Sequence, residues 1–148
     1  MITYRKATIK DINWIVSVLA KDMFSLLGEE ELPDYEYLKE TFLPILINTG
    51  ICIIAEQDNI QIGCIGGLTH PILYNPNKKS LTELFWWVRE ESRGTSVGAK
   101  LLLLFEGAGL DIKVDYINMS IMPNTVLNKD SLIKRGYIHK ESSYVRKI

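Results

Sequence analysis

The sequence predicts a mixed α/β protein of the α+β class, in which antiparallel hairpins are combined with one strand–helix–strand crossover. β-rich runs flank a turn at Asp58-Asn59, which indicates a hairpin near the middle of the chain. An apolar run at 81–88 then passes through a loop of small residues into a strongly apolar helical pattern at 96–110. A further β-rich run at 114–121 follows this helix and completes the crossover.

The N-terminal third is predicted to hold one strand and two helices. Residues 2–7 form a strand, and Thr8 with Asp11 has the spacing of a helix-capping box. Apolar residues at helical spacing follow on one face: Ile12, Ile15, Val16, Leu19 and Met23. After an acidic break, a second helix is expected over about 34–47, where Pro44 should bend or shorten it.

The hairpin strands are expected at 51–56 and 60–68, and a polar loop is expected over 70–79. Beyond the crossover, Asn124 or Thr125 could cap a last helix that Gly136 ends. The remaining segment, 137–148, is predicted to form one or two closing strands.

Composition narrows the class of protein. A chain of 148 residues is most simply one domain, 1–148, with a core of its own. Net charge is −1 and basic residues are scattered among acids, so neither nucleic acid nor a membrane surface is expected as a partner. The N-terminus lacks the pattern of a secretion signal and no apolar run approaches a membrane span, so a cytoplasmic protein is expected.

Cysteine and histidine usage argues against a metal site. The two cysteines, Cys52 and Cys64, flank the predicted hairpin turn and are expected to be free thiols of the core. The two histidines, His70 and His139, do not cluster with them in sequence. No metal is therefore predicted.

The junction between the strand at 81–88 and the following helix is the strongest functional signal. Such a junction directs several backbone N–H groups and the positive end of a helix dipole at one spot, which suits a phosphate or diphosphate. The nucleotide-triphosphate loop does not fit, because three residues separate Gly94 from Gly98 and Leu101 follows Lys100. The three-glycine dinucleotide fingerprint does not fit either. A helix start without any ligand remains an alternative.

Arg93-Gly94-Thr95-Ser96-Val97-Gly98 resembles the pyrophosphate loop, Arg/Gln-x-x-Gly/Ala-x-Gly/Ala, of the GNAT superfamily of acyl-CoA-dependent N-acetyltransferases. Ser96, where the family usually has Gly, is the one departure. The segments 5–11 and 133–137 resemble the family's opening and closing motifs. The strand Glu83-Leu84-Phe85-Trp86-Trp87-Val88 looks most like small acetyltransferases of phage or prophage origin.

The resemblance implies a GNAT fold with a mixed central sheet of about six to seven strands, splayed at the cofactor site, and about four helices. It also implies acetyl-CoA (coenzyme A) as cofactor, lying between the strands at 81–88 and 114–121. By this resemblance the cofactor-binding residues are Trp87, Val88, Arg89, Arg93, Gly94, Thr95, Ser96, Val97, Gly98, Ala99 and Asn124. Adjacent strand residues face opposite sides, so at least one of Trp86 and Trp87 can equally be plain core.

Glu83 is the candidate catalytic residue, because many enzymes of the family carry a catalytic or substrate-binding glutamate in this strand. A carboxylate in an apolar strand is costly to bury unless it is hydrogen-bonded. The alternative is a solvated Glu83 that pairs with Lys78 or Lys79. Leu132 stands where the family's general-acid tyrosine is usual, which leaves the general acid open.

The acceptor is expected to contact Glu30, Glu31, Tyr35 and His70. Clustered carboxylates would favour a cationic amine such as a polyamine, an aminoglycoside or a basic peptide. A solvated acidic turn and a bystander histidine are the alternatives. The sequence thus predicts acetyl transfer to a primary amine in a ternary complex, with a homodimer as one expected assembly. The rival interpretation is a non-catalytic acyl-CoA-binding or protein-interaction module.

Overall fold

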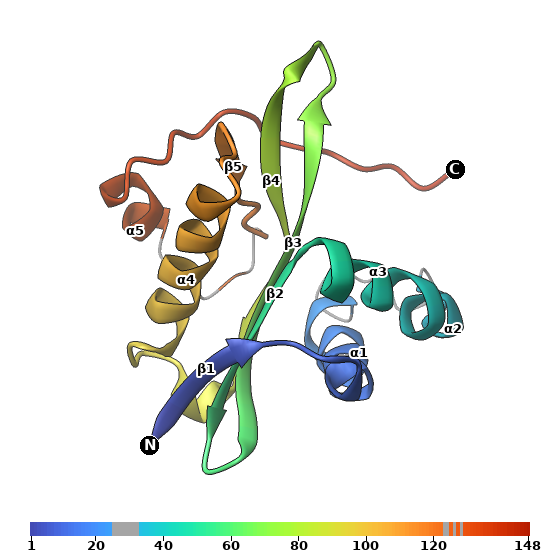
Figure 1. Ribbon diagram of the computed structural model, residues 1–148, viewed down its shortest axis with the longest axis vertical. Helices are drawn as coiled ribbons and strands as arrows, with labels where there is room; N and C mark the ends of the chain where they lie inside the picture. Colours follow the sequence, from blue (N-terminus) through green and yellow to red (C-terminus); the bar gives the residue numbers. More distant parts are fainter. Residues whose placement is uncertain (25–32, 123–124, 126, 128) are drawn as a thin grey trace.

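The computed structural model describes residues 1–24, 33–122, 125, 127 and 129–148. Its centre is a five-stranded sheet in the order β1-β2-β3-β4-β5 (Figure 1). The strands are β1 (Ile2–Lys6), β2 (Ile51–Gln57), β3 (Ile60–Ile72), β4 (Asn75–Val88) and β5 (Tyr116–Asn118). The first three pairings are antiparallel and the β4–β5 pairing is parallel, which confirms the predicted mixture of hairpins and one crossover.

Helices cover both faces of the sheet (Figure 1). On one face lie α1 (Ile12–Val18), α2 (Tyr35–Tyr37) and α3 (Leu43–Thr49), joined into longer helical stretches by the 3-10 turn η1 (Ile9–Asp11) and the π-helical segments η2 (Leu19–Phe24) and η3 (Leu38–Phe42). The other face carries α4 (Val97–Asp111) and α5 (Lys129–Lys134). No helix among the described residues is both long and apolar enough to cross a membrane.

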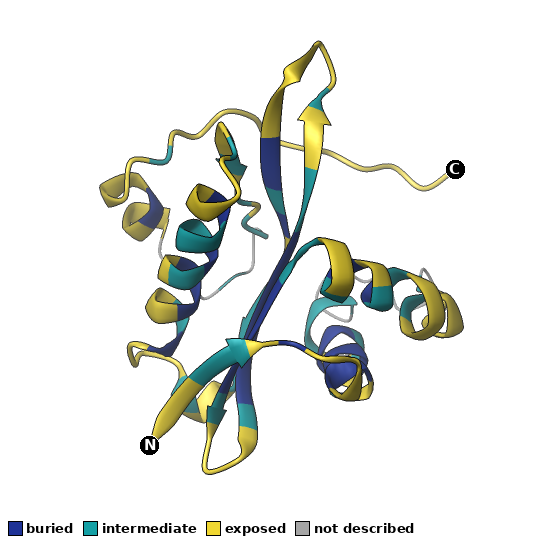
Figure 2. Cartoon of the chain, in the orientation of Figure 1, coloured by how far each residue is buried: buried dark blue, intermediate teal, exposed yellow. Residues whose placement is uncertain are grey.

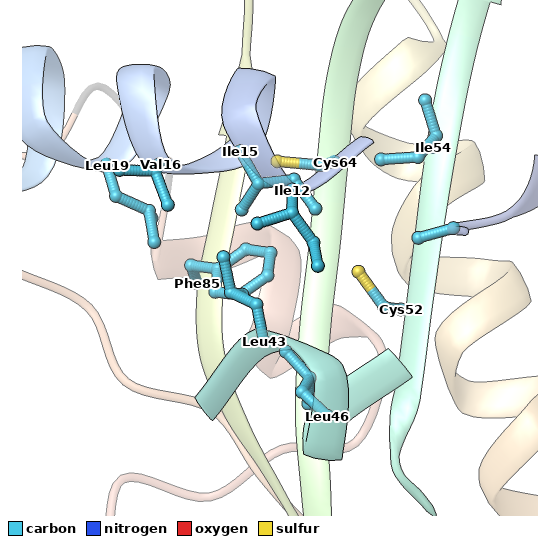
Figure 3. Packing of buried hydrophobic residues seen from close by; sticks show 11 residues of the cluster. Ile12, Ile15, Val16, Leu19, Leu43, Leu46, Cys52, Ile54, Cys64 and Phe85 are labelled. Carbon is cyan, nitrogen blue, oxygen red and sulfur yellow. The ribbon is translucent and has the colours of Figure 1, made fainter. Parts of the chain in front are cut away.

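Two apolar cores result, one on each face of the sheet. The core under α1 and α3 includes Phe85 of β4, with Cys52 and Cys64 buried beside it (Figure 3). The core under α4 is centred on Phe105 and Leu101, which are fully buried. Figure 2 shows the resulting pattern, with buried residues along the middle of the sheet and exposed residues at its ends.

The N-terminal cap forms around Asp11, as its spacing predicts. The Asp11 carboxylate accepts the Thr8 N–H over 2.8 Å and binds the Arg5 guanidinium over 2.8 Å at each of its two oxygens. Arg5 also donates to Glu56 of β2. The Arg5 guanidinium holds the pKa of the Asp11 carboxyl well below its usual range, although the burial of Asp11 acts in the opposite direction. This ion pair fixes the helical entrance against β1 and β2.

The second predicted helix is confirmed, and Pro44 affects its geometry without ending it. Asp34 caps the helix by accepting the Tyr37 N–H over 3.0 Å. A proline in a helix removes one N–H donor and crowds the preceding turn. The π-helical segment Leu38–Phe42 lies directly before Pro44, and the chain then continues as α3 to Thr49.

The turn of the β2–β3 hairpin also lies where the sequence predicts. Asp58 and Asn59 have φ values of 52° and 63°. Two consecutive residues with positive φ are the signature of a type I′ turn, whose twist matches that of the flanking strands. Aspartate and asparagine tolerate this backbone conformation better than most residues do.

The prediction of a polar loop over 70–79 is wrong. β3 continues to Ile72, β4 begins at Asn75, and the register Ile72↔Asn75 leaves a tight turn between them. β2 pairs with β3 only as far as Gly67, so Pro71 lies where β3 has a partner on one side alone. A proline is tolerated at such an edge position because no partner there needs its missing N–H.

The closing strands expected over 137–148 are also wrong, and the described residues form a sheet of five strands where about six to seven were expected. The apolar side chains of this segment, Ile138, Val145 and Ile148, are largely exposed and add nothing to either core. The end of the last helix is confirmed. Gly136 has a φ of 92°, and the Tyr137 N–H donates to the Leu132 carbonyl over 3.1 Å.

Candidate active site

The sheet opens where β5 ends. β5 pairs with β4 only through Ser80↔Tyr116, Leu81↔Ile117 and Thr82↔Asn118, whereas β4 continues to Val88. Among the described residues, no strand pairs with 83–88 on the side away from β3. An unpaired strand edge offers N–H and C=O groups to an extended ligand. The splay expected between these two strands is therefore a feature of the structure.

Backbone direction decides which residues face this open edge. The Arg89 N–H donates to the Ile62 carbonyl of β3 over 2.8 Å. Because backbone groups alternate sides along a strand, the N–H and C=O of Val88 and Trp86 point toward the open edge. Arg93 Nε lies 2.9 Å from the Val88 carbonyl oxygen, which agrees with that direction. Of the two predicted backbone donors, Val88 therefore faces the edge and Trp87 faces β3.

The Trp87 side chain lies on the α1 face of the sheet. Its Nε1–H donates to Asp22 Oδ2 over 2.5 Å, and its ring meets Trp14 edge-on with centroids 5.8 Å apart. Trp86 packs on the opposite face, against the α4 core. Asp22 was missed at the sequence level, because a single acid at the end of a helical pattern carries no signal of a partner 65 residues away.

A β-bulge interrupts β4 at Leu84. Gly66 pairs with Phe85 and the next residue, Gly67, pairs with Glu83, so Leu84 has no opposite residue. An extra residue in one strand breaks the alternation of faces and bends the strand. Glu83 therefore follows the alternation set by Leu81 in the α4 core, while Phe85 enters the core on the other face.

Glu83 lies at the point where the strands part. It follows Thr82, the last residue of β4 that pairs with β5, and its side chain is 7% exposed. Its Oε2 accepts the Ser120 N–H over 3.2 Å. Burial raises the pKa of Glu83 to about 7, although the Ser120 N–H lowers it in part. The alternative of a solvated Glu83 paired with Lys78 does not match this geometry, because Lys78 binds Asp115 over 2.9 Å.

The predicted diphosphate loop, 93–98, follows a short 3-10 turn, η4 (Glu90–Ser92), and leads into the start of α4. Gly94 has a φ of 76°, a conformation that favours glycine. In the first hydrogen bond of the helix, the Lys100 N–H donates to the Ser96 carbonyl over 2.9 Å. The amides of Val97, Gly98 and Ala99 precede that hydrogen bond and lack partners within the helix.

Two observations show that this helix start can receive an anion. The first turn of α4 carries no acidic residue, and the Ser96 side chain makes no capping hydrogen bond. Thr95 Oγ1 reaches the Val97 N–H at only 3.4 Å. The dipole of a 15-residue helix and the amides of its first turn are thus left for an external partner. The donor set fits the diphosphate of coenzyme A.

The other predicted loop residues are placed as follows. Arg89 Nη2 donates to the Gln61 carbonyl over 2.9 Å, which ties its side chain to β3. A Cβ on Gly98 would lie 3.6 Å from Val88 and 3.7 Å from the Trp86 ring, so the helix start packs directly against β4. Asn124 lies outside the described residues.

Nearby tyrosines do not fill the family's general-acid position. Leu132 is buried in the core under α4. The Tyr137 hydroxyl donates to Glu106 Oε1 over 3.0 Å, and burial together with that carboxylate raises the pKa of Tyr137. Tyr144 lies in the exposed C-terminal segment.

Of the predicted acceptor residues, Glu30 and Glu31 lie outside the described residues, and Tyr35 is a partly exposed residue at the start of α2. His70 lies in β3, with Nε2 2.7 Å from Thr82 Oγ1 and Nδ1 3.0 Å from the Pro71 carbonyl oxygen. A carbonyl can only accept, so Nδ1 carries a proton in this contact. The structure thus brings His70 beside the residue that precedes Glu83.

No protein-family model matches the sequence, and no curated protein sequence matches it. Solved structures that are similar over nearly the whole chain include the following three. One is a predicted acetyltransferase with acetyl-CoA from Clostridium acetobutylicum, with 22% identity and a TM-score of 0.78 over 99% of this chain and 96% of that chain. A transcriptional regulator from Bacillus halodurans has 17% identity and a TM-score of 0.80 over all of both chains. A GNAT family acetyltransferase from Staphylococcus aureus has 18% identity and a TM-score of 0.68 over 99% of this chain and 98% of that chain.

Proposed function

We propose that this chain, which has the fold of the GNAT acetyltransferases, is an N-acetyltransferase that moves an acetyl group from acetyl-CoA to a primary amine. One observation carries the proposal. The buried carboxyl of Glu83 stands where β4 and β5 part, and the open β4 edge leads from it to the uncapped start of α4. A base and a diphosphate site are thereby joined by one unpaired strand edge.

The chain's own groups would hold the cofactor at two places. The amides of Val97, Gly98 and Ala99 would bind the diphosphate, helped by the helix dipole. The backbone groups of Trp86 and Val88 would pair with the amide-bearing arm, as a further strand would. When bound, acetyl-CoA supplies a thioester carbonyl that an amine can attack.

Glu83 would act as the general base. An alkylammonium with a pKa of about 10.4 must lose a proton before its nitrogen can attack a carbonyl. A carboxylate whose pKa is near 7 takes up that proton more readily than an ordinary glutamate does. The nitrogen would then form a bond to the acetyl carbon as the carbon–sulfur bond breaks. The nitrogen would release its second proton to solvent, and the sulfur would leave with the electron pair and take up a proton from solvent.

Direct transfer in a ternary complex is favoured because the cysteines are poor nucleophiles. Cys52 and Cys64 are both buried in the core under α1. Burial raises the pKa of Cys52 to about 12 and raises that of Cys64 as well. A thiol that stays protonated at neutral pH does not accept an acetyl group efficiently.

The rival function is a non-catalytic module that binds acyl-CoA or another protein. The buried Leu132 at the usual tyrosine position favours it, and so does the likeness to a structure described as a transcriptional regulator. Fold alone does not decide between the two functions.

The deciding experiment is titration of the protein with acetyl-CoA by calorimetry, followed by thiol release in the presence of a panel of primary amines. Saturable binding with amine-dependent thiol release supports the transferase. Saturable binding without release from any amine supports an acyl-CoA-binding module. No binding at high micromolar acetyl-CoA contradicts the transferase and the acyl-CoA-binding module, and leaves the protein-interaction module.

A further inference from the structure

The indole N–H of Trp86 has no hydrogen-bond partner in the part of the chain that the structure describes. Among those residues, Trp86 Nε1 is the one side-chain nitrogen or oxygen atom that is both buried and unpaired. Buried polar groups are nearly always hydrogen-bonded, because a donor that leaves water without gaining an acceptor costs free energy. The unpaired N–H is therefore either a cost that the fold tolerates or a donor that a ligand completes.

The neighbouring tryptophan shows that β4 can present an indole to a partner. Trp87 lies on the α1 face, and its Nε1–H donates to Asp22 Oδ2 over 2.5 Å. Trp86 instead packs against the core under α4. The buried members of that core are apolar side chains, so they offer the Trp86 indole no side-chain acceptor.

The N–H edge of the Trp86 ring lies beside the start of α4. A Cβ on Gly98 would be 3.7 Å from Trp86 Cζ2 and 3.9 Å from Trp86 Nε1. These are ordinary van der Waals distances, so the space between Gly98 and the ring accepts one methyl-sized atom. The amides of 97–99, which lack partners within the helix, belong to the same turn. The indole is thus a fourth donor beside the proposed diphosphate site.

The open edge of β4 gives a ligand access to this place. Trp86 lies beyond Thr82, the last residue of β4 that pairs with β5. Its own backbone N–H and C=O point toward the open edge. A ligand that pairs with these backbone groups and reaches the start of α4 therefore passes beside the Trp86 side chain.

The donor set indicates which acceptor fits. An indole N–H can only donate a hydrogen bond. Hydrogen bonds to ionised oxygens are shorter and stronger than those between neutral groups. The first turn of α4 carries no acidic residue that would compete for the indole. A phosphate oxygen therefore suits this position better than a neutral amide carbonyl does.

We propose that the Trp86 indole N–H binds an oxygen of the coenzyme A diphosphate, together with the amides of the first turn of α4. The inference rests on the transferase function proposed above and adds a side-chain contact to its cofactor site. Because the N–H is buried and unpaired in the free protein, it gains an acceptor on binding without first losing one. The contact thereby favours the bound state.

The indole signal of Trp86 tests the contact in the wild-type protein by nuclear magnetic resonance. The chain has three tryptophans, so the spectra of Trp14→Phe and Trp87→Phe assign two indole N–H signals and leave the third to Trp86. We expect coenzyme A and adenosine 5′-diphosphate to move the Trp86 proton signal downfield, and pantetheine to leave it in place. A Trp86 signal that stays in place at saturating coenzyme A would overturn the inference and leave the transferase standing. A shift with pantetheine and not with adenosine 5′-diphosphate would overturn it as well, by assigning the acceptor to the pantetheine arm.

A matched pair of variants measures what the contact contributes. Trp86→Phe removes the donor and keeps an aromatic ring, and Trp14→Phe makes the same change on α1, where the ring meets Trp87. Calorimetry should show coenzyme A bound at least tenfold more weakly by Trp86→Phe and with wild-type affinity by Trp14→Phe. Wild-type affinity in a folded Trp86→Phe protein would contradict the contact. If circular dichroism shows that Trp86→Phe does not fold, the indole signal of the wild-type protein decides alone. Absence of coenzyme A binding to the wild-type protein would contradict the transferase and this inference together.

Discussion

The Ser120 N–H donates to Glu83 Oε2 over 3.2 Å, so a carboxyl group one residue beyond the last pair of β4 with β5 holds the chain that has just left β5. The same carboxyl is 7% exposed. One hydrogen bond only partly offsets the cost of burying a charge, which is why the pKa of Glu83 rises to about 7.

The pH dependence of stability tests this environment without any ligand. Below the ordinary pKa of about 4.3, Glu83 is protonated in both the folded and the unfolded chain. Between that value and about 7 the folded state binds the extra proton, so the free energy of unfolding should decrease as pH rises. Denaturant titrations at pH 5 and pH 8 should therefore show that the free energy of unfolding of Glu83→Gln, relative to that of the wild type, increases by up to about 3 kcal/mol between the two pH values. Equal pH profiles for the two proteins would mean that Glu83 titrates normally.

The same substitution tests the catalytic role. If Glu83 takes the proton, kcat/KM should rise with pH through an apparent pKa near 7, and Glu83→Gln should lower kcat by about 100-fold or more. The affinity for acetyl-CoA should stay close to that of the wild type, because the proposed diphosphate site lies at the other end of the open edge. A Glu83→Gln enzyme with an unchanged kcat would exclude the assignment.

Ser96→Asp tests the proposed cofactor site with a substitution that should not destabilise α4. Aspartate is a good N-cap residue and its charge is favourable at a helix N-terminus, so the variant should fold at least as well as the wild type. Its carboxylate would nevertheless repel a diphosphate at that place. Calorimetry should show acetyl-CoA bound at least tenfold more weakly, while Ser142→Asp in the exposed C-terminal segment should bind it normally. If a folded Ser96→Asp protein kept its affinity for acetyl-CoA, the diphosphate would have to bind elsewhere.

The Asp22–Trp87 hydrogen bond links the π-helical segment η2 to β4 and can be measured by a double-mutant cycle. Hydrogen bonds to charged groups contribute on the order of 1.5–3 kcal/mol. We expect Asp22→Ala and Trp87→Phe to show a coupling in unfolding free energy at the lower end of that range, because the bond is only partly buried. Strictly additive effects of the two substitutions would mean that the bond does not form in solution.

Two glycines provide a matched test of close packing. A Cβ on Gly67 would lie 2.6 Å from both the Phe105 ring and the Thr82 carbonyl oxygen, so Gly67→Ala should destabilise the protein by several kcal/mol. A Cβ on Gly107, inside α4, would meet open space. Gly107→Ala should therefore raise the unfolding free energy by about 0.5–1 kcal/mol, since alanine is the better helix former. Thermal unfolding of both variants checks the pair, and a stable Gly67→Ala would contradict the register of β3 and β4.

Local signals allowed much of the fold to be predicted from the sequence. The Asp58-Asn59 turn, the Asp11 cap and the Gly136 helix end each depend on a few neighbouring residues, and the structure has all three. The prediction of a loop over 70–79 was wrong because the polar composition of this segment suggested a loop, whereas the segment forms a hairpin. Pro71 is tolerated there because it lies at an edge of the sheet.

Features of the site that depend on distant contacts could not be predicted. The buried Glu83 contacts the chain beyond β5 through the Ser120 N–H, 37 positions away, and the Asp22–Trp87 bond joins residues 65 positions apart. A pocket of about 260 Å³ on the α1 face combines residues from η2, α2, η3 and β4, so no sequence window contains it.

The bulge at Leu84 makes β4 tolerant of a change in its length at this point. Leu84 can change in chemical character with little effect on the strand, because it has no opposite residue. Deleting it would bring Phe85 directly after Glu83, and regular alternation would then place Phe85 on the face that it already occupies. Phe85 would stay in the core under α1, and the two neighbouring tryptophans would keep their faces. Relatives that share this architecture can therefore lack this one residue without exchanging the side chains that the rest of the strand presents to the two cores.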